Sequence, residues 1–173
     1  LGGEAVNMAI HSKKGNTPRS HDHRLNWAEM FDTCVSNTGT IEADGVARAA
    51  LLGIPAITDP FSPLEVSSFI AQSKGSFQVL DSLGTCKFCV RTMPPLIVRL
   101  LKGATGWDLT WEDLMQIGRR TVNMMRVFNV THGIGPETEE PSPKYGSVPV
   151  DGPAKGKDVM SSWSAMLDNY YEI

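Results

Sequence analysis

The sequence predicts a mainly α-helical, irregular domain with long loops. In segment 25–35, large apolar side chains recur at helical spacing and mark one buried face, at Trp27, Met30, Phe31 and Cys34. Two later segments open with residues that start helices, Ser62-Pro63 and Thr110. Between residues 134 and 156 the chain is rich in proline and glycine, which indicates a long loop.

Length and composition limit the classes of protein that fit. The chain has 173 residues, enough for one domain with a core, and 20% of them are charged, as in soluble globular proteins. A net charge of −3 gives no support for nucleic-acid binding, and no run approaches the ~20 apolar residues of a membrane span. Three cysteines, an odd number, argue against a disulfide framework and favour a reducing compartment, the cytoplasm. Because the chain opens on Leu1 and not on methionine, we expect a fragment of a longer protein.

The N-terminal part predicts a loop followed by the first helix. Residues 11–24 lack an apolar period and hold three of the four histidines. Two of these, His21 and His23, flank an aspartate, which would suit a metal site, although an exposed polar loop explains the same pattern. In the helix that follows, Cys34 lies on the apolar face and is expected in the core. Residues 36–39, Ser-Asn-Thr-Gly, end this helix with residues that tolerate turns.

Three further helices are expected before the middle of the chain. Residues 43–52 are small and mostly apolar and suggest a helix. Segment 62–74 begins with Ser-Pro-Leu-Glu, which combines a serine cap, a proline at the first helical position and a glutamate three residues after the cap. Residues 76–80 predict another helix, whose end presents Asp81.

The C-terminal half predicts three more helices. After Met93, two prolines make a rigid break, and residues 96–102 form a short apolar helix that stops at Gly103. The longest helix, 110–128, starts with a Thr-Trp-Glu-Asp cap. Its broad apolar stripe consists of Leu114, Ile117, Val122, Met125 and Phe128. The last helix covers residues 157–170.

Residues 81–89, Asp-Ser-Leu-Gly-Thr-Cys-Lys-Phe-Cys, are the candidate functional site. Gly84 allows a tight bend or the close approach of a ligand, and Asp81 lies three residues before it, where its carboxylate can accept hydrogen bonds from that ligand. Cys86 follows the bend and could bind a soft metal as a thiolate. Cys86 and Cys89 form a C-x-x-C pair, which supplies at most two of the four ligands that a zinc ion or an iron–sulfur cluster needs. Two small apolar fillers and a capping aspartate explain the same residues, and a thioredoxin-type pair is less favoured because no βαβ pattern surrounds it.

The octapeptide from Asp81 resembles the second pterin-binding motif, Asp-x-x-Gly-Leu-Cys, of the tungsten aldehyde:ferredoxin oxidoreductase family. By this resemblance Asp81 would hydrogen-bond one of two pyranopterins, with Gly84 and Thr85 beside it, and Cys86 would be the fourth ligand of a 4Fe–4S cluster. The other three cluster ligands of the family, spaced C-x-x-C-x-x-x-C, have no counterpart in this sequence. Thr85 stands where leucine is usual, and Cys89 matches no family ligand and is expected to be ordinary packing.

Three other segments agree with this family in their order and approximate spacing. Residues 36–39 are similar to the start of its Ser-Asn-Arg-Gly-x-x-His segment, whose histidine lies near the tungsten and exchanges protons with substrate; Glu42 stands at that position. A glutamate in an enclosed pocket can act as a general acid or base, and the alternative for Glu42 is a solvated loop carboxylate. The helix end at 128–129 and the Gly-Pro-Ala-Lys-Gly segment 152–156 also resemble the family.

The resemblance implies the C-terminal helical domain of the aldehyde:ferredoxin oxidoreductase fold. Residues 1–24 would end the preceding domain and connect it to the helical domain, 25–173. The implied function is that of a fragment of a tungsten or molybdenum bis-pyranopterin, iron–sulfur enzyme. Such an enzyme oxidises aldehydes to carboxylic acids with ferredoxin as electron acceptor, and the fragment alone would be inactive without the remaining domains of the full-length chain.

Two alternatives to this function stay open. Glu42 in place of the family's histidine allows a benzoyl-CoA-reductase-type catalytic subunit, which acts on an aryl-CoA substrate. The contrasting class is a non-catalytic helical module that recruits a partner or binds zinc through Cys86 and Cys89.

Overall fold

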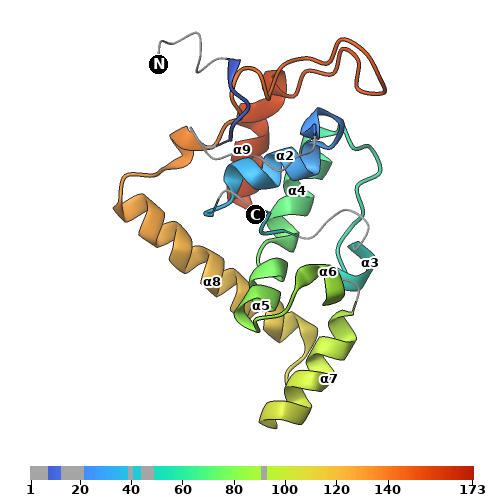
Figure 1. Cartoon of the computed structure of the whole chain (residues 1–173), viewed down its shortest axis with the longest axis vertical. Helices are drawn as coiled ribbons and strands as arrows, with labels where there is room; N and C mark the ends of the chain where they lie inside the picture. Colours follow the sequence, from blue (N-terminus) through green and yellow to red (C-terminus); the bar gives the residue numbers. More distant parts are fainter. Residues whose placement is uncertain (1–7, 13–21, 39–40, 44–48, 91–92) are drawn as a thin grey trace.

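The computed structural model describes residues 8–12, 22–38, 41–43, 49–90 and 93–173. In these ranges helices are joined by irregular loops, and the β-type pairing among them is limited to one isolated bridge between Ser12 and Pro141 (Figure 1). The α-helices are α2 (Trp27–Val35), α3 (Ala49–Leu52), α4 (Pro63–Ser73), α5 (Ser76–Ser82), α6 (Lys87–Val90), α7 (Pro94–Thr105), α8 (Trp111–Thr131) and α9 (Trp163–Glu172). Short 3₁₀ turns are η1 (His23–Leu25), η3 (Pro136–Thr138) and η4 (Met160–Ser162). The predicted mainly helical class is confirmed. Among the described residues, none of the helices has the length and apolar character of a transmembrane span.

The larger hydrophobic core lies where α2, α4 and α9 meet. Helix α4 packs along α9 and against α2, and Figure 1 shows these three helices together at the centre of the molecule. The predicted apolar face of α2 is buried here, and Cys34 is fully enclosed, which confirms its expected place in the core. Among the other buried members of this core are Phe69, Ile70, Tyr145, Trp163 and Met166.

A smaller core lies between α5, α7 and α8. Its buried members are Phe77, Val79, Leu80, Ile97 and Leu114. Helix α5 is therefore short but firmly held, because most of its side chains are buried while its last turn reaches the surface. This arrangement gives the bend after α5 a rigid base.

The start of α4 follows the predicted capping signal, with one difference. The hydroxyl of Ser62 accepts a hydrogen bond from the Glu65 N–H at 3.4 Å, and Pro63 occupies the first helical position. The Glu65 carboxylate does not return to the cap residue. It accepts hydrogen bonds from the backbone N–H groups of Thr58 (2.6 Å) and Asp59 (3.2 Å), and so ties the preceding extended segment to the helix.

Two predicted helix boundaries are wrong for identifiable reasons. Pro94 and Pro95 start α7 instead of preceding it, because the first helical turn has no backbone acceptor for their missing N–H groups. The helix then continues through Gly103 to Thr105. Helix α3 is described only from Ala49, since residues 44–48 of the expected helix lie outside the described residues.

Helix α8 is predicted correctly at its start and incorrectly along its second half. Thr110 and Asp113 form a capping box, with hydrogen bonds of 3.1 and 2.8 Å in the two directions. Leu114 and Val122 are buried as expected, but Phe128 is 62% exposed. Figure 1 shows α5 crossing α8 in its N-terminal half, so the expected stripe is well covered there and becomes exposed toward Phe128.

The last helix begins later than predicted. Its first turn is preceded by η4, in which the Asp158 carboxylate accepts hydrogen bonds from the N–H groups of Met160 (3.0 Å) and Ser161 (3.3 Å). This local side-chain cap holds the chain in a tighter turn before α9 starts at Trp163.

The segment before α2 is more structured than the expected loop. His23 is buried in η1, and its Nδ1 forms a hydrogen bond with the Tyr145 hydroxyl, so the exposed-loop interpretation is wrong for this histidine. His21, the other half of the possible metal pair, lies outside the described residues. The Ser142 hydroxyl donates to the Ala9 carbonyl at 2.7 Å, which fastens the N-terminal segment to the long loop. The domain boundary at residue 24 stays a prediction.

Candidate functional site

Helix α5 positions the candidate site because its two ends are fixed. At its start, Gly75 adopts φ of 95° and lies against Gly118 of α8; a Cβ on Gly118 would be 2.1 Å from the Gly75 carbonyl oxygen. The two glycines let the backbones of α5 and α8 touch. Seven residues of helix then span about 10 Å at 1.5 Å per residue to the bend that follows.

The bend after α5 is a Schellman motif centred on Gly84. The Gly84 N–H donates to the Asp81 carbonyl at 3.0 Å, and the Thr85 N–H donates to the Leu80 carbonyl at 3.1 Å. Gly84 has φ of 66°, a conformation that costs other L-residues free energy. A Cβ on Gly84 would have no atom within 4 Å, so the bend opens onto free space and the glycine is required by its backbone angle.

The bend presents a carboxylate and a thiol at the surface. Asp81, in the last turn of α5, and Cys86, which follows the bend, are both exposed. The Cys86 carbonyl accepts hydrogen bonds from the N–H groups of Cys89 (2.9 Å) and Val90 (3.3 Å), so Cys86 immediately precedes the short helix α6. The structure therefore brings together Asp81, Gly84, Thr85 and Cys86, as the sequence predicts.

Cys89 does not pack in the interior. Its thiol is exposed beside that of Cys86, which makes the interpretation of both residues as small apolar fillers wrong. The side-chain hydrogen bond with Cys86, and the negative charge that Cys86 can carry, raise the pKa of the Cys89 thiol.

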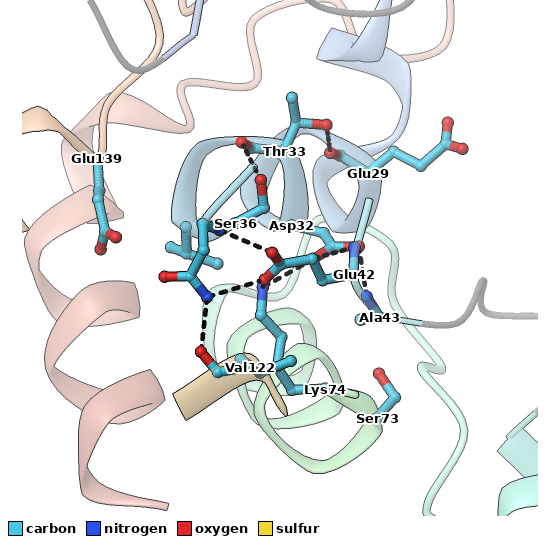
Figure 2. A network of polar contacts seen from close by, with 12 residues as sticks. Glu29, Asp32, Thr33, Ser36, Glu42, Ala43, Ser73, Lys74, Val122 and Glu139 are labelled. Atoms are coloured by element: carbon cyan, nitrogen blue, oxygen red, sulfur yellow. Dashed lines mark hydrogen bonds and ion pairs between the residues drawn. The ribbon is translucent and has the colours of Figure 1, made fainter. Parts of the chain in front are cut away.

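Glu42 lies in a buried polar network and is not a solvated loop carboxylate. Its side chain is completely buried. Figure 2 shows its carboxylate between α2 and the side chain of Lys74, which reaches up from the end of α4. Lys74 Nζ lies 3.2 Å from Glu42 Oε2, and the Asn37 N–H donates to Glu42 Oε1 at 2.9 Å.

Asp32 completes this network from α2. Its carboxylate accepts hydrogen bonds from the N–H groups of Glu42 (3.1 Å) and Ala43 (2.9 Å), and it lies 3.1 Å from Lys74 Nζ. Burial disfavours the Lys74 ammonium, but the two carboxylates outweigh this cost and raise the pKa of Lys74 above its ordinary value. One buried cation thus holds two buried anions.

Asp32 and Lys74 are not among the residues predicted for the site. Asp32 carried a usable signal, because it is a charged residue between Phe31 and Thr33 in a helix that is otherwise almost entirely buried. A buried aspartate needs a cationic or N–H partner. Lys74 gave no such signal, since it lies at the end of α4, where lysine is common in solvent.

A third buried carboxylate, Glu139, belongs to the long loop. It forms an ion pair with Arg126 of α8 and accepts a hydrogen bond from the Tyr171 hydroxyl. Arg126 also donates to the Val35 carbonyl at 2.9 Å. The contacts of Arg126 link α8 to α2 and the long loop.

Glu42 and the thiol pair lie at opposite ends of α5. The Gly75 N–H, just before α5, donates to the Glu42 carbonyl at 3.2 Å, whereas Cys86 follows the other end of the helix. The candidate site residues therefore form two groups. One group contains Asp81, Gly84, Thr85 and Cys86, and the other contains Glu42 with its buried partners.

The donor set of this chain suits one ligand of a shared metal centre. Among the residues that the structure describes, no three His, Cys, Asp or Glu side chains gather as a metal site. This part of the chain thus offers no complete zinc site around Cys86 and Cys89. The exposed thiol of Cys86 and the exposed carboxylate of Asp81 could each supply one contact to a cluster or a pterin whose remaining ligands come from elsewhere.

Comparisons with known proteins identify the family. The model for "Aldehyde ferredoxin oxidoreductase, domains 2 & 3" matches residues 1–173. The chain is 37% identical over 98 residues to a tungsten-containing aldehyde ferredoxin oxidoreductase of Pyrococcus furiosus, covering 55% of this chain and 16% of the relative. It is 34% identical over 128 residues to the protein of that name from Thermococcus kodakarensis, covering 71% of this chain and 21% of the relative.

The matches therefore cover only 16% and 21% of the lengths of these two relatives. No solved structure matches the chain. Because the family model covers every residue, the chain belongs to the aldehyde ferredoxin oxidoreductase family, within its domains 2 and 3.

Proposed function

We propose that this chain is part of a tungsten or molybdenum bis-pyranopterin, iron–sulfur oxidoreductase that oxidises aldehydes to carboxylic acids and passes electrons to ferredoxin. The observation that carries the proposal is the exposed pair of Asp81 and Cys86 on either side of one rigid bend. Membership of the family, and the word tungsten in the names of two relatives, support the class of chemistry. Cofactors of this kind supply the electron transfer when bound.

In the proposal, the bend binds a pterin. The exposed Asp81 carboxylate accepts hydrogen bonds from N–H groups, and Gly84 leaves the space above the bend open to a flat ring. The Thr85 hydroxyl donates to the Leu80 carbonyl at 2.9 Å. Thr85, which stands where the family has leucine, therefore directs its hydroxyl proton into the bend and not toward the ligand.

Cys86 is the proposed cluster ligand. Its exposed thiol loses its proton on binding iron, as metal-ligating thiols do. Two hydrogen bonds to the Cys86 carbonyl hold the backbone of this residue, so its sulfur projects from a fixed position on the surface. The other three cysteine ligands would come from the remaining domains of the full-length chain.

Glu42 is the proposed proton-exchanging group. Oxidation of an aldehyde by water releases two protons and two electrons, so the protein must accept protons near the substrate and conduct electrons away. Because Glu42 contacts one end of α5, which is about 10 Å long, and Cys86 follows the other end, protons and electrons would leave by different ends of this helix. Asn37 and Lys74 fix the orientation of the Glu42 carboxylate.

The cofactor content of the full-length protein tests the first part of the proposal. After anaerobic expression with tungstate, we expect tungsten, iron and pterin in the wild-type protein, measured by metal analysis and pterin fluorescence. Cys86→Ala should lose cluster iron, because a four-thiolate site lacks one ligand. Asp108→Asn, a change in an exposed residue, is the control and should keep it. A wild-type protein without all three components contradicts the proposal.

Turnover tests the second part. The full-length protein should oxidise aldehydes with ferredoxin as acceptor, and Glu42→Gln should lower kcat by about 10²–10⁴-fold with unchanged iron and pterin content, the range for loss of a general base. An unchanged kcat in Glu42→Gln excludes this residue as the proton acceptor. Reduction of aryl-CoA esters in place of aldehyde oxidation would favour the benzoyl-CoA-reductase-type alternative.

A further inference from the structure

A cavity between α4, α8 and α9 brings three positively charged side chains together. Its volume is about 340 Å³, at the lower end of the range for small-molecule sites. Lys74, at the end of α4, and Arg119 and Arg126 of α8 line it, and Asn123 adds an amide group. Among the described residues that line the cavity, none has an acidic side chain.

The carboxylates that pair with two of these cations are not part of the cavity lining. Lys74 Nζ contacts the carboxylates of Asp32 and Glu42. Arg126 is paired with Glu139. All three carboxylates are buried behind the cations, so the charged side chains at the cavity itself are positive.

Two aromatic rings hold these paired cations in position. Lys74 Nζ lies 5.6 Å from the centroid of the Tyr170 ring, and Arg126 Cζ lies 5.6 Å from that of Tyr171. Both tyrosines belong to α9 and also line the cavity. The positive wall is therefore fixed before any ligand binds.

The third cation, Arg119, has a neutral partner. Its Nη2 donates to the Gln72 carbonyl at 2.7 Å, which holds the guanidinium in place without compensating its charge. That bond uses one of the five N–H groups of a guanidinium, and a carboxylate or a phosphate needs two more for the bidentate contact that arginine favours. Arg119 is thus suited to bind an anion from solution.

We infer that this cavity binds the oxyanion group of a small molecule, a carboxylate or a phosphate, and that Arg119 is its principal ligand. A bound anion compensates the charge of Arg119 and offsets the repulsion among three neighbouring cations. The lining does not include Asp81 or Cys86, so the inference does not rest on the proposed contacts to a pterin and a cluster.

Isothermal titration calorimetry of the full-length protein with sodium benzoate, and separately with inorganic phosphate, is the first test. We expect at least one anion to bind, and Arg119→Gln to raise its Kd by about 10–100-fold, the effect of losing a charge-assisted hydrogen bond. The matched control is Arg120→Gln, which removes the same charge from the next, exposed residue outside the cavity lining and should keep the wild-type Kd. Binding of benzoate alone identifies a carboxylate as the ligand group, and binding of phosphate alone a phosphate. Failure of both anions to bind, or equal effects of the two substitutions, overturns the inference.

The second test needs no variant. Phenylglyoxal modifies arginine side chains, and fragmentation mass spectrometry of the labelled wild-type protein separates Arg119 from Arg120. Rising concentrations of the bound anion should slow the modification of Arg119 toward a limit and leave the rate at Arg120 unchanged. An unprotected Arg119 overturns the inference. A protein that shows the protection but lacks tungsten, iron and pterin contradicts the proposed function and leaves the anion site intact.

Discussion

Lys74 is the residue on which the buried network depends. Its ammonium lies 3.1 Å from Asp32 and 3.2 Å from Glu42, and all three side chains are almost completely buried. A buried ion pair adds little net stability compared with an apolar pair, because both charges lose their hydration. Removing one partner is different, since the charges that remain have neither water nor a counter-ion.

Lys74→Met should therefore destabilise the protein strongly. It leaves the carboxylates of Asp32 and Glu42 buried without their cation, and the expected loss in the free energy of unfolding is about 3–5 kcal/mol. Urea unfolding followed by circular dichroism measures it. The control is Lys102→Met, which breaks an exposed pair with Asp108 and should cost about 0–1 kcal/mol. Equal losses in the two variants contradict the buried network.

The sequence could predict which site residues lie together where they are close neighbours along the chain. The grouping of Asp81, Gly84 and Cys86 follows from a single bend, and the structure confirms that bend. The burial of Glu42 could not be predicted, because its partners Asp32 and Lys74 lie 10 and 32 positions away in the sequence. Such contacts depend on the packing of α2 against α4, which no local pattern specifies.

At the scale of elements, the contact between α5 and α8 depends on two glycines. A Cβ on Gly118 would be 2.1 Å from the Gly75 carbonyl oxygen and 3.0 Å from a methyl group of Val79. The first neighbour is backbone and cannot rotate away. The two helices must separate to accommodate any side chain at Gly118.

Gly118→Ala should destabilise the protein by at least the ~1–3 kcal/mol that overpacking costs. The matched control is Gly103→Ala in α7, where a Cβ meets nothing within 4 Å. There alanine should stabilise the protein by about 0.5–1 kcal/mol, the difference in helix propensity. Chemical unfolding of both variants measures whether the free energy of unfolding falls in Gly118→Ala and rises in Gly103→Ala. Stabilisation by Gly118→Ala would mean that α5 and α8 do not touch at this point.

Helix starts were predictable where a side chain caps the helix, whereas the starts of α7 and α9, which have no side-chain cap, were not. Ser62 and Thr110 cap their helices through their own hydroxyl groups, as expected. The end of α7 was predicted at Gly103, but glycine only weakens a helix, and α7 continues to Thr105. The apolar stripe on α8 follows helical spacing along the whole helix, but the sequence of α8 does not determine which part of the stripe another helix covers.

At the scale of the whole molecule, the long loop between α8 and α9 joins the separate parts. Tyr145 from this loop enters the larger core and holds the buried His23, while Glu139 holds Arg126 of α8. The Trp163 indole N–H of α9 donates to the Glu139 carbonyl at 2.8 Å. A loop that the sequence describes only as rich in proline and glycine thus supplies several of the fold's long-range contacts.

The same contacts predict a loss of stability in alkali. Burial raises the pKa of Tyr145, with the negative charges of nearby groups adding to it, and the pKa of Lys74 is also raised. In the unfolded chain both groups titrate at about pH 10. Because the folded pKa values lie above the unfolded ones, the stabilisation is fully present below about pH 10 and is lost as the pH rises from there toward the folded values.

Unfolding titrations in urea at about pH 8 and about pH 11 check this expectation, because the pH values bracket the unfolded pKa of tyrosine and lysine. The free energy of unfolding should be lower at the higher pH. In Tyr145→Phe the decline should be shallower than in wild type, since phenylalanine has no proton to lose, even though this variant starts from a lower stability without the hydrogen bond to His23. If the free energy of unfolding declines equally steeply with pH in both proteins, the Tyr145 hydroxyl is solvated. Such a result would contradict the packing of Tyr145, and with it the long loop, in the larger core.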